Sequence, residues 1–375
     1  MAEPVGVAVI GYGVMGKAHA YGYTVAPRIR ELAGEPQLRV LTGRNEAAVE
    51  AAAHAYGFPE WTTDWRAAVA RDDVDLVDIC TPPGTHAEIA EAAAAAGKAV
   101  LCEKPLAVRY DDGRRALAAV REAGVQHAVG FNYRRLPAVS LVKRLVGEGA
   151  VGTVRLWRAI WLSDEFVDPT IPFDWRFDAA MGGSTIGDLG CHLVDLARWI
   201  VGEIDDVCAQ SATFVPSRSD GNGTRAVEID DSSAALVRFA GGATGIFELS
   251  RSCPRRPCDW SIEVNGSEGT LVFEYPRLNE LRYGSVRDDE TLYGMRTIRA
   301  EHPTHPYADA WWPIGQGVGY GTTFANQAAD LLEHWPRGDW TPNFDDGVAA
   351  LAVCAAMERS AAERRWVRVE EIAAA

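Results

Sequence analysis

Hydrophobic and polar positions follow two different patterns along the chain, and the change comes shortly after residue 131. From Val5 to Phe131, short β-branched runs alternate with longer amphipathic or Ala-rich segments. This alternation predicts βαβ units around a doubly wound parallel sheet. Each predicted strand is short and bounded by turn residues; the strands are Val5–Ile10, Gln37–Thr42, Asp75–Cys80, Ala99–Cys102 and His127–Phe131.

One Ala-rich segment of this region carries signals at both of its ends. Thr85, with Glu88 three residues later, predicts a capping box at the start of a helix. Gly97 is expected at the C′ position, where the backbone favours glycine. The alanines between these signals are therefore expected to form an ordinary helix.

Beyond Leu136, a short helix is followed by longer strands in which buried and exposed positions alternate. Their spacing and Gly-rich turns predict a large, open and mostly antiparallel sheet covered by helices on one face. The stretch from Pro216 to Arg225 is expected to be an exposed, mobile loop. The expected strands are 154–162, 207–215, 234–239, 244–249, 261–264 and 270–273, and the expected helices are 188–201, 323–334 and 346–364.

The length of 375 residues fits two domains, because a single hydrophobic core seldom grows much past about 250 residues. We place an α/β dinucleotide-binding domain at residues 1–131 and an α/β substrate-binding and oligomerisation domain at residues 132–375. A net charge of -15 argues against nucleic acid as a partner. No apolar run is long enough to span a membrane, no signal peptide is recognised, and the seven scattered cysteines fit a cytoplasmic protein with reduced thiols.

A glycine motif directly follows the first predicted strand and opens a helical run: Gly11-Tyr12-Gly13-Val14-Met15-Gly16. The first glycine allows a tight turn, the second lets the backbone approach a pyrophosphate, and the third permits close packing of the helix. Amides at the start of the helix, around Val14 and Met15, would bind the phosphates. The motif therefore predicts a nicotinamide dinucleotide cofactor, against the alternative of an ordinary strand-to-helix turn.

The end of the second strand bears on the choice between NAD and NADP. An acid that would bind both ribose hydroxyls of NAD is missing from Thr42-Gly43-Arg44-Asn45. Arg44 could pair with the 2′-phosphate of NADP, or it could stack on the adenine and leave NAD usable. Two further loops at the carboxyl ends of strands are candidates for the cofactor site, namely Thr81-Pro82 with His86 and Glu103-Lys104-Pro105.

The second region offers a candidate base. Asp188, His192 and Asp195 are spaced i, i+4 and i+7 on a predicted helix, so that they would share one face. A histidine oriented by a carboxylate suits a general base near neutral pH. The alternative is a surface stripe of salt bridges, but the apolar flank of this helix favours burial. Lys104 is the second candidate, because the chain has only four lysines and a partly buried lysine can relay a proton as arginine cannot.

Together these motifs resemble the glucose-fructose oxidoreductase, inositol dehydrogenase and MocA family over nearly the whole chain. The similar segments are the glycine motif, Thr81-Pro82 with His86, Glu103-Lys104-Pro105, Phe131-Asn132-Tyr133-Arg134 and Gly187-Asp188-x-Gly190-x-His192-x-x-Asp195. The resemblance implies a Rossmann domain, an open-sheet domain and a homodimer or homotetramer, with one NAD or NADP per subunit and no metal. Asn132, Trp175 and Arg176 would join the cofactor site, and Tyr133 and Arg134 the substrate site.

The same resemblance implies the roles of three catalytic residues. His192 would take the proton of a sugar hydroxyl, Lys104 would bind the reacting oxygen, and Asp188 would position the sugar or the base. Asn132-Tyr133-Arg134-Arg135 and Trp175-Arg176-Phe177 are similar to a branch of the family that oxidises the C3 hydroxyl of pyranose sugars. Anhydrosugars, glycosides and the aminoglycoside sugars of antibiotic biosynthesis are candidate substrates.

Two rival functions remain open. The first is a glycoside hydrolase that holds NAD tightly and oxidises C3 transiently to eliminate an aglycone. The second is a nucleotide sensor that keeps the fold without turnover, although the intact set of Lys104, Asp188 and His192 argues against it.

Overall fold

A computed structural model describes residues 2–336, 338 and 340–374 of the chain. The chain forms two compact units, of which the first comprises Met1–Arg135 and Gly319–Val348 and the second Leu136–Val318 and Ala349–Ala375. The sequence places a single boundary between residues 131 and 132. The structure differs in that the segment Gly319–Val348 returns to the first unit.

Helix α8 (Gly321–Glu333) is the reason for this return. A Cβ atom built on Gly22 of helix α1 (Val14–Ile29) would lie 2.6 Å from the carbonyl oxygen of Phe324, so the two helix backbones are in close contact. Apolar residues of α8, including Leu332, complete the core around strand β1 (Glu3–Ile10). The prediction that the helix at 323–334 covers the antiparallel sheet is therefore wrong, because an amphipathic pattern shows that a helix has an apolar face but not which sheet that face covers.

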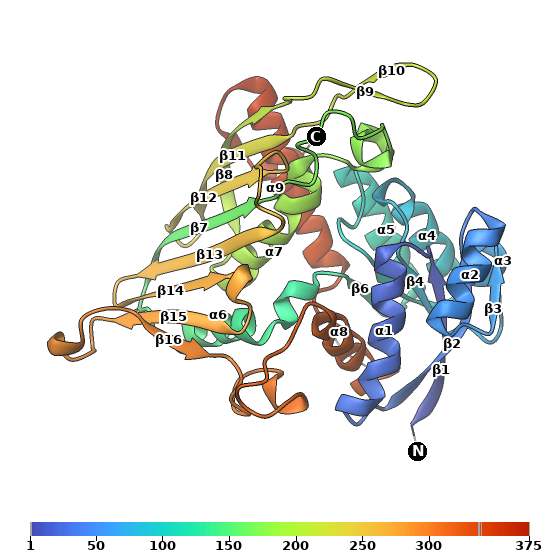
Figure 1. The fold of residues 1–375 in the computed structure, drawn as a ribbon, viewed down its shortest axis with the longest axis horizontal. Coiled ribbons are helices and arrows are strands. Elements are labelled where there is room, and N and C mark those ends of the chain that lie inside the picture. The colour runs from blue at the N-terminus through green and yellow to red at the C-terminus, as the bar shows by residue number, and fades with distance from the viewer. Residues whose placement is uncertain (1, 337, 339, 375) are drawn as a thin grey trace. The chain divides into compact units, whose positions relative to one another are not determined.

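Six parallel strands form the sheet of the first unit, in the order β3-β2-β1-β4-β5-β6 (Figure 1). The chain order reverses between β1 and β4, the place where doubly wound sheets bind ligands. The predicted parallel sheet is confirmed, and the three-residue edge strand β3 is an addition to it. The remaining elements are β2 (Gly34–Thr42), β3 (Glu60–Thr62), β4 (Leu76–Ile79), β5 (Ala99–Cys102), β6 (His127–Val129), α2 (Glu46–Tyr56), α3 (Trp65–Val69), α4 (His86–Ala95), α5 (Tyr110–Ala123) and η2 (Asn132–Arg135).

The start of α4 corrects one prediction. Thr85 ends a 3-10 turn, η1 (Pro83–Thr85), and its hydroxyl donates to a carbonyl oxygen of the preceding residues instead of capping the helix. The predicted capping box of Thr85 and Glu88 is therefore wrong, because the turn before the helix already uses the threonine hydroxyl. Gly97 does follow the helix with a φ of 72°, as predicted for a C′ glycine.

Nine strands form the sheet of the second unit, in the order β16-β15-β14-β13-β7-β12-β11-β8-β17. All neighbours are antiparallel except β7 and β12, so the predicted mostly antiparallel sheet is confirmed. Helix α6 packs on β14 and β15, and α7 packs on β7 (Figure 1). The elements are β7 (Val154–Leu162), β8 (Ile204–Ala212), β11 (Ser232–Phe239), β12 (Thr244–Ser250), β13 (Asp259–Gly266), β14 (Gly269–Glu274), β15 (Glu280–Ser285), β16 (Arg296–Arg299), β17 (Val367–Arg368), α6 (Pro137–Gly147), α7 (Cys191–Ile200), α9 (Phe344–Glu363) and α10 (Glu370–Ala373), with short turns η3 (Trp175–Phe177), η4 (Ala179–Met181), η5 (Ile186–Gly190), η6 (Tyr275–Arg277), η7 (Glu290–Leu292) and η8 (Ala308–Ala310).

The loop predicted at residues 216–225 is exposed as expected, except at Arg218, but it has regular structure. This segment forms a two-stranded ribbon, β9 (Ser217–Ser219) with β10 (Thr224–Ala226). Arg218 is 2% exposed and donates to the carbonyl oxygens of Phe166, Asp168 and Ile171. A buried guanidinium that binds three carbonyl groups explains the order, and polar composition alone could not reveal it.

Among the described residues, no helix combines the length and the apolar character that a membrane span requires.

Candidate active site

The glycine motif forms the turn between β1 and α1 that a dinucleotide needs. Gly11 has a φ of 114°, and a Cβ atom there would lie 2.6 Å from the carbonyl oxygen of Cys80. A Cβ atom on Gly16 would lie 2.0 Å from the carbonyl oxygen of Gly11. Gly13, in contrast, faces open space within 4 Å, and α1 begins at the next residue without an acid in its first turn. The backbone therefore leaves room for a pyrophosphate at the amide end of α1, and the site fits the predicted cofactor.

The end of β2 shows why an acid is absent from this turn. A Cβ atom on Gly43 would lie 2.0 Å from Cδ1 of Tyr12, so any side chain at position 43 would displace that ring. The hydroxyl of Tyr56 also donates to the Tyr12 carbonyl oxygen at 3.2 Å. Arg44 is exposed at the same edge of the sheet. Its guanidinium is thus accessible to an adenosine ribose or its phosphate.

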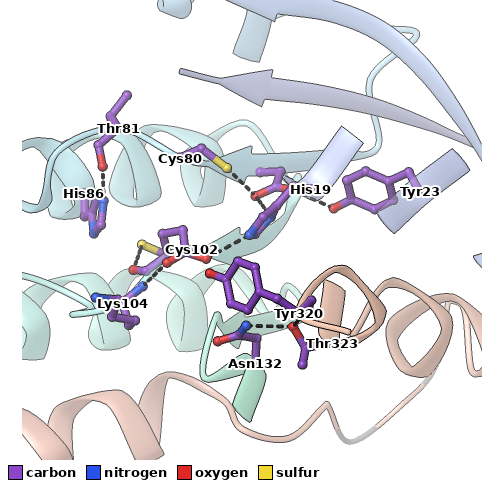
Figure 2. A network of polar contacts seen from close by, with 12 residues as sticks. His19, Tyr23, Cys80, Thr81, His86, Cys102, Lys104, Asn132, Tyr320 and Thr323 are labelled. Carbon is purple, nitrogen blue, oxygen red and sulfur yellow. Dashed lines mark hydrogen bonds and ion pairs between the residues drawn. The ribbon is translucent and has the colours of Figure 1, made fainter. Parts of the chain in front are cut away.

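His86 connects the two other predicted cofactor loops. Its Nε2 atom lies 2.7 Å from the carbonyl oxygen of Thr81, and its Nδ1 atom lies 2.9 Å from that of Pro105 (Figure 2). The ring is fully buried, and this burial lowers the pKa of His86. Thr81 and Pro82 remain half-buried at the carboxyl end of β4. The buried His86 ring therefore fixes the spacing between these two loops.

Lys104 follows β5, with its neighbour Glu103 buried beneath it. One carboxylate oxygen of Glu103 accepts a hydrogen bond from the Lys104 main-chain N–H at 3.1 Å, and the other lies 2.8 Å from Nε2 of His19. Lys104 itself is half-buried, as its predicted role requires. The carboxyl end of β5 thus presents a lysine whose backbone is held by a buried carboxylate.

The turn η2 contains the predicted residues Asn132, Tyr133 and Arg134. The Asn132 side chain donates to the Thr323 hydroxyl at 2.8 Å (Figure 2). The rings of Tyr133 and Tyr320 are 6.2 Å apart. Arg134 is 7% exposed and forms an ion pair with Asp346 at 3.0 Å. Within the first unit, the turn therefore contacts the returning segment Gly319–Val348.

Asp188 and His192 belong to the second unit and do not share one continuous α-helix. Asp188 lies in the π-helical turn η5, and α7 begins only at Cys191. The predicted helix is confirmed as one helical run through residues 186–200, but its first turn is π-helical, and this wider turn shifts Asp188 relative to the predicted α-helical spacing. His192 is 6% exposed and its ring stacks on Trp161 at 5.6 Å. The buried flank predicted for this helix is confirmed.

A buried arginine approaches the Asp188 carboxylate. Arg251 has no exposed surface, and its Nη1 atom lies 3.8 Å from Oδ2 of Asp188. Its Nη2 atom donates to the carbonyl oxygens of Gly183 and Asp230. Within the described part of the chain, Nε and Nη1 of Arg251 have no hydrogen-bond partner, so that Asp188 is the nearby counter-charge.

Trp175 and Arg176 lie in the short turn η3 of the second unit. The guanidinium of Arg176 lies over the Trp175 ring at 4.5 Å, and the Asp174 side chain accepts from the Arg176 main-chain N–H. Both predicted residues are half-buried.

The sequence analysis did not identify three charged residues that lie near the candidate site residues, namely His19, Asp78 and Arg251. The strand β4 did give a signal, because Asp78 is a fully buried acid inside an otherwise apolar parallel strand. Charged side chains are almost never fully buried unless they are paired. Such an acid therefore requires a partner, although the sequence does not say which.

Comparison with known proteins agrees with this architecture. Residues 5–131 match the model of the oxidoreductase family with an NAD-binding Rossmann fold, and residues 139–272 match the GFO/IDH/MocA C-terminal domain. Levoglucosan dehydrogenase of Pseudarthrobacter phenanthrenivorans is 38% identical to this chain, covering 98% of it and 99% of that protein.

Solved structures extend the likeness to three dimensions. An oxidoreductase domain protein from Kribbella flavida has a TM-score of 0.95 at 42% identity, covering 98% of this chain and 100% of its own. A complex of levoglucosan dehydrogenase with NADH and levoglucosan has a TM-score of 0.95 at 38% identity, covering 98% and 100%. A protein of gentamicin A biosynthesis, in complex with NAD, has a TM-score of 0.74 at 28% identity, covering 98% and 97%.

The parallel sheet, the glycine turn and this likeness over nearly the full length lead to one conclusion. The chain belongs to the GFO/IDH/MocA family of oxidoreductases, and residues 5–131 are its NAD-binding Rossmann domain.

Proposed function

We propose that the protein is an NAD-dependent dehydrogenase that oxidises a ring hydroxyl of a pyranoside, at C3, to the ketone. The observation that carries this proposal is the position of Lys104, directly after β5 in the sheet whose β1–α1 turn is built for the cofactor. The likeness to levoglucosan dehydrogenase over 98% of the chain supports a sugar as the substrate.

Three side chains divide the work in this proposal. His192 accepts the proton of the sugar hydroxyl, Lys104 donates a hydrogen bond to the oxygen on which negative charge develops, and Asp188 orients the sugar or the base. NAD, when bound, accepts the hydride that leaves the carbinol carbon. The alcohol thus loses one hydride and one proton and becomes a ketone. Stacking on Trp161 fixes the plane of the His192 ring.

NAD is the proposed physiological cofactor, and NADP is the alternative that Arg44 keeps open. Exposed Arg44 can bind a 2′-phosphate, whereas position 43 cannot carry the acid that would repel one without moving Tyr12. The ratio of kcat/KM for the two cofactors, in the wild type and in Arg44→Ala, decides between them. A ratio that does not change with the substitution would assign Arg44 no part in the choice.

The substrate class can be narrowed by charge. A net charge of -15 favours a cationic aminosugar over an anionic one by long-range attraction. A protein of gentamicin A biosynthesis is among the structural relatives, which also supports an aminoglycoside ring. Neutral anhydrosugars and simple glycosides are the other candidates.

The test is NADH formation with the purified protein, NAD or NADP, and a panel of levoglucosan, simple glucosides, inositols and kanamycin-like aminoglycosides. Lys104→Met and His192→Ala are each expected to lower kcat about 10²- to 10⁴-fold, the usual contribution of a positioned acid or base. NADH binding to each variant is the folding control. Wild-type turnover in both variants would contradict the proposal, and release of an aglycone without net NADH would indicate a hydrolase.

We also propose a homodimer or homotetramer that covers the open face of the nine-stranded sheet. Leu236 of β11 and Ile246 of β12 are cross-strand neighbours on this face and are 51% and 40% exposed. A single pair of exposed apolar side chains is common on monomers, but here it lies on a sheet face with alternating burial in both strands. A second copy of the chain is the proposed cover.

A further inference from the structure

A chain of buried polar groups connects the cofactor helix to the loop that carries Lys104. His19 lies on α1, one turn after the glycine motif, and its ring is 3% exposed. Its Nδ1 atom lies 2.8 Å from Oδ2 of Asp78 in β4, and its Nε2 atom lies 2.8 Å from Oε1 of Glu103 after β5. Both carboxylates are also buried, at 0% and 3% exposure. Figure 2 shows His19 between its neighbour Tyr23 and the segment that leads to Lys104.

The hydrogen-bond donors and acceptors around His19 determine the charge of its ring. An ionised carboxylate only accepts hydrogen bonds, so a histidine that contacts one at each nitrogen donates at both and is an imidazolium. The hydroxyl of Tyr23 and the thiol of Cys80 donate to Asp78, at 2.8 and 3.5 Å. The main-chain N–H of Lys104 donates to the second oxygen of Glu103. The groups that face the His19 ring are thus two acids, the thiol of Cys80 directly after β4, and the Phe324 ring of α8 at 5.3 Å.

The direction of the His19 pKa agrees with this assignment. Burial, the largest single influence, lowers the pKa of His19, but Asp78 and Cys80 together outweigh it, and the pKa is well above its ordinary value. Burial and Asp78 also raise the pKa of Tyr23, which therefore stays a hydrogen-bond donor. Because buried charges are stable only when paired, Asp78 and Glu103 stabilise the cation and the cation stabilises both acids.

A metal ion is the other occupant that these side chains could suggest. Ligand atoms of His19, Asp78 and Cys80 lie within 4.8 Å of one another. A metal needs a deprotonated ring nitrogen as ligand. Both nitrogens of His19 are at hydrogen-bond distance from carboxylates, so the geometry favours an imidazolium over a metal ligand.

We propose that His19 is a positioning residue for Lys104: bridging Asp78 and Glu103, it fixes the carboxylate that holds the Lys104 main chain. One end of this connection is α1, whose first turn binds the cofactor phosphates, and the other is the lysine proposed to bind the reacting oxygen. Placement of the cofactor and placement of Lys104 are therefore coupled through one imidazolium. This inference rests on the proposed function for the role of Lys104, whereas the charge of His19 can be tested without it.

The kinetic test compares His19→Gln with Tyr23→Phe. Both variants remove a hydrogen bond to Asp78, but only His19→Gln breaks the connection to Glu103. We expect kcat of His19→Gln to fall about 10- to 100-fold, as for a displacement of about 1 Å at the reacting centre, with a much smaller change in KM for NAD. The deuterium isotope effect on kcat is measured with a substrate deuterated at the oxidised carbon. A larger isotope effect in His19→Gln than in the wild type would show that hydride transfer itself is slowed.

A purely structural role predicts something else. Both variants would then lose thermal stability, and kcat would fall equally in the two or in neither, with an unchanged isotope effect. That result would overturn the proposal. Full wild-type kcat in a folded His19→Gln variant would do the same.

The charge test uses the wild-type chain and needs no substrate. In a sample with ¹⁵N-labelled histidine, the His19 signals, assigned by their loss in His19→Gln, should report two protonated ring nitrogens throughout the stable neutral and mildly alkaline range. A signal of neutral imidazole, or one zinc ion bound per chain, would overturn the imidazolium bridge. If no sugar is oxidised, the proposed function fails while this measurement still decides the charge of His19.

Discussion

Single residues with charges decide most of the chemistry of this protein, and the sequence exposes some of them better than others. Lys104, Asp188 and His192 lie in recognisable motifs, so they can be named from the sequence. His19 cannot be paired in that way, because its partners Asp78 and Glu103 are 59 and 84 residues away. Arg251 is missed for the same reason, as it lies 63 residues from Asp188 by the numbering (251 minus 188).

Arg251 is expected to support Asp188 in the reaction. Arg251→Met removes the cation 3.8 Å from the Asp188 carboxylate, and we expect kcat/KM to fall about 10- to 100-fold through loss of positioning. Melting temperature, measured beside kcat/KM, separates this positioning effect from a loss of stability.

The matched control is Arg218→Met, which removes another buried arginine from the same unit. Arg218 lies over the Phe177 ring at 4.2 Å and binds backbone carbonyl groups. Arg218→Met should lower the melting temperature without a comparable fall in kcat/KM. A fall of equal size in both variants would refute a specific link between Arg251 and Asp188.

His86 makes stability depend on pH. The two carbonyl groups beside His86 are neutral, unlike the carboxylates beside His19, and burial lowers the pKa of folded His86 by more than these contacts raise it. The unfolded chain therefore binds a proton that the folded chain excludes. The free energy of unfolding therefore decreases as the pH falls below about 6.5, the ordinary value for histidine. Melting temperatures between pH 7.5 and 5.5, measured by calorimetry, should show a gap between wild type and His86→Asn that narrows toward acid.

Exposed His54 of α2 provides the comparison for this measurement. His54→Asn makes the same histidine-to-asparagine change at an exposed position and is the matched control for the substitution itself. A constant gap between wild type and His86→Asn would contradict the assignment to His86.

Secondary-structure elements show where local sequence suffices. The strands of the first unit and the glycine turn are correctly predicted, because alternation of short apolar runs with helices and the need for glycine at a φ of 114° are local properties. The capping box is wrong, and residues 216–225 form an exposed ribbon instead of an irregular loop. In each case a neighbouring segment, such as the turn before α4 or the buried side chain of Arg218, decides the local conformation.

Substitutions at two glycines of the β1–α1 turn should distinguish an effect on stability from an effect on cofactor binding. Gly16→Ala places a Cβ atom 2.0 Å from a backbone oxygen, and we expect a loss of stability of about 1–3 kcal/mol, as for an overpacked core. Gly13→Ala meets nothing within 4 Å and should keep the melting temperature. It should weaken NADH binding about tenfold, because the backbone no longer approaches the pyrophosphate as closely.

Thermal melting and fluorescence titration with NADH measure both effects. If Gly13→Ala binds NADH as tightly as the wild type, the pyrophosphate does not contact this turn, and the assignment of the glycine motif fails.

At the scale of the whole molecule, the division into two units and the open sheet face matter most. The returning segment Gly319–Val348 shows that the chain crosses between units more often than its patterning indicates. Family membership, in contrast, follows from motifs that are spread over the chain, and the comparisons confirm it.

The open face of the nine-stranded sheet is expected to bind a second copy of the chain. Leu236→Asp combined with Ile246→Asp places two charges on cross-strand neighbours of this face, so the oligomer should dissociate. Light scattering coupled to size-exclusion chromatography measures the mass of each species. Leu292→Asp, at a side chain that is 74% exposed but lies outside the strands, is the control. An unchanged mass for the double variant would exclude this face as the interface.

The sequence by itself determined the parallel and antiparallel sheets and the cofactor turn, and it named Lys104, Asp188 and His192 as candidate site residues, because periodicity and short motifs act over a few neighbouring residues. Only the tertiary structure decided that α8 packs on α1, that Asp188 lies in a π-helical turn, and that His19 bridges two acids. The physical reason is that packing and charge pairing join residues far apart in the chain. Their cost or benefit depends on burial, which local sequence does not specify.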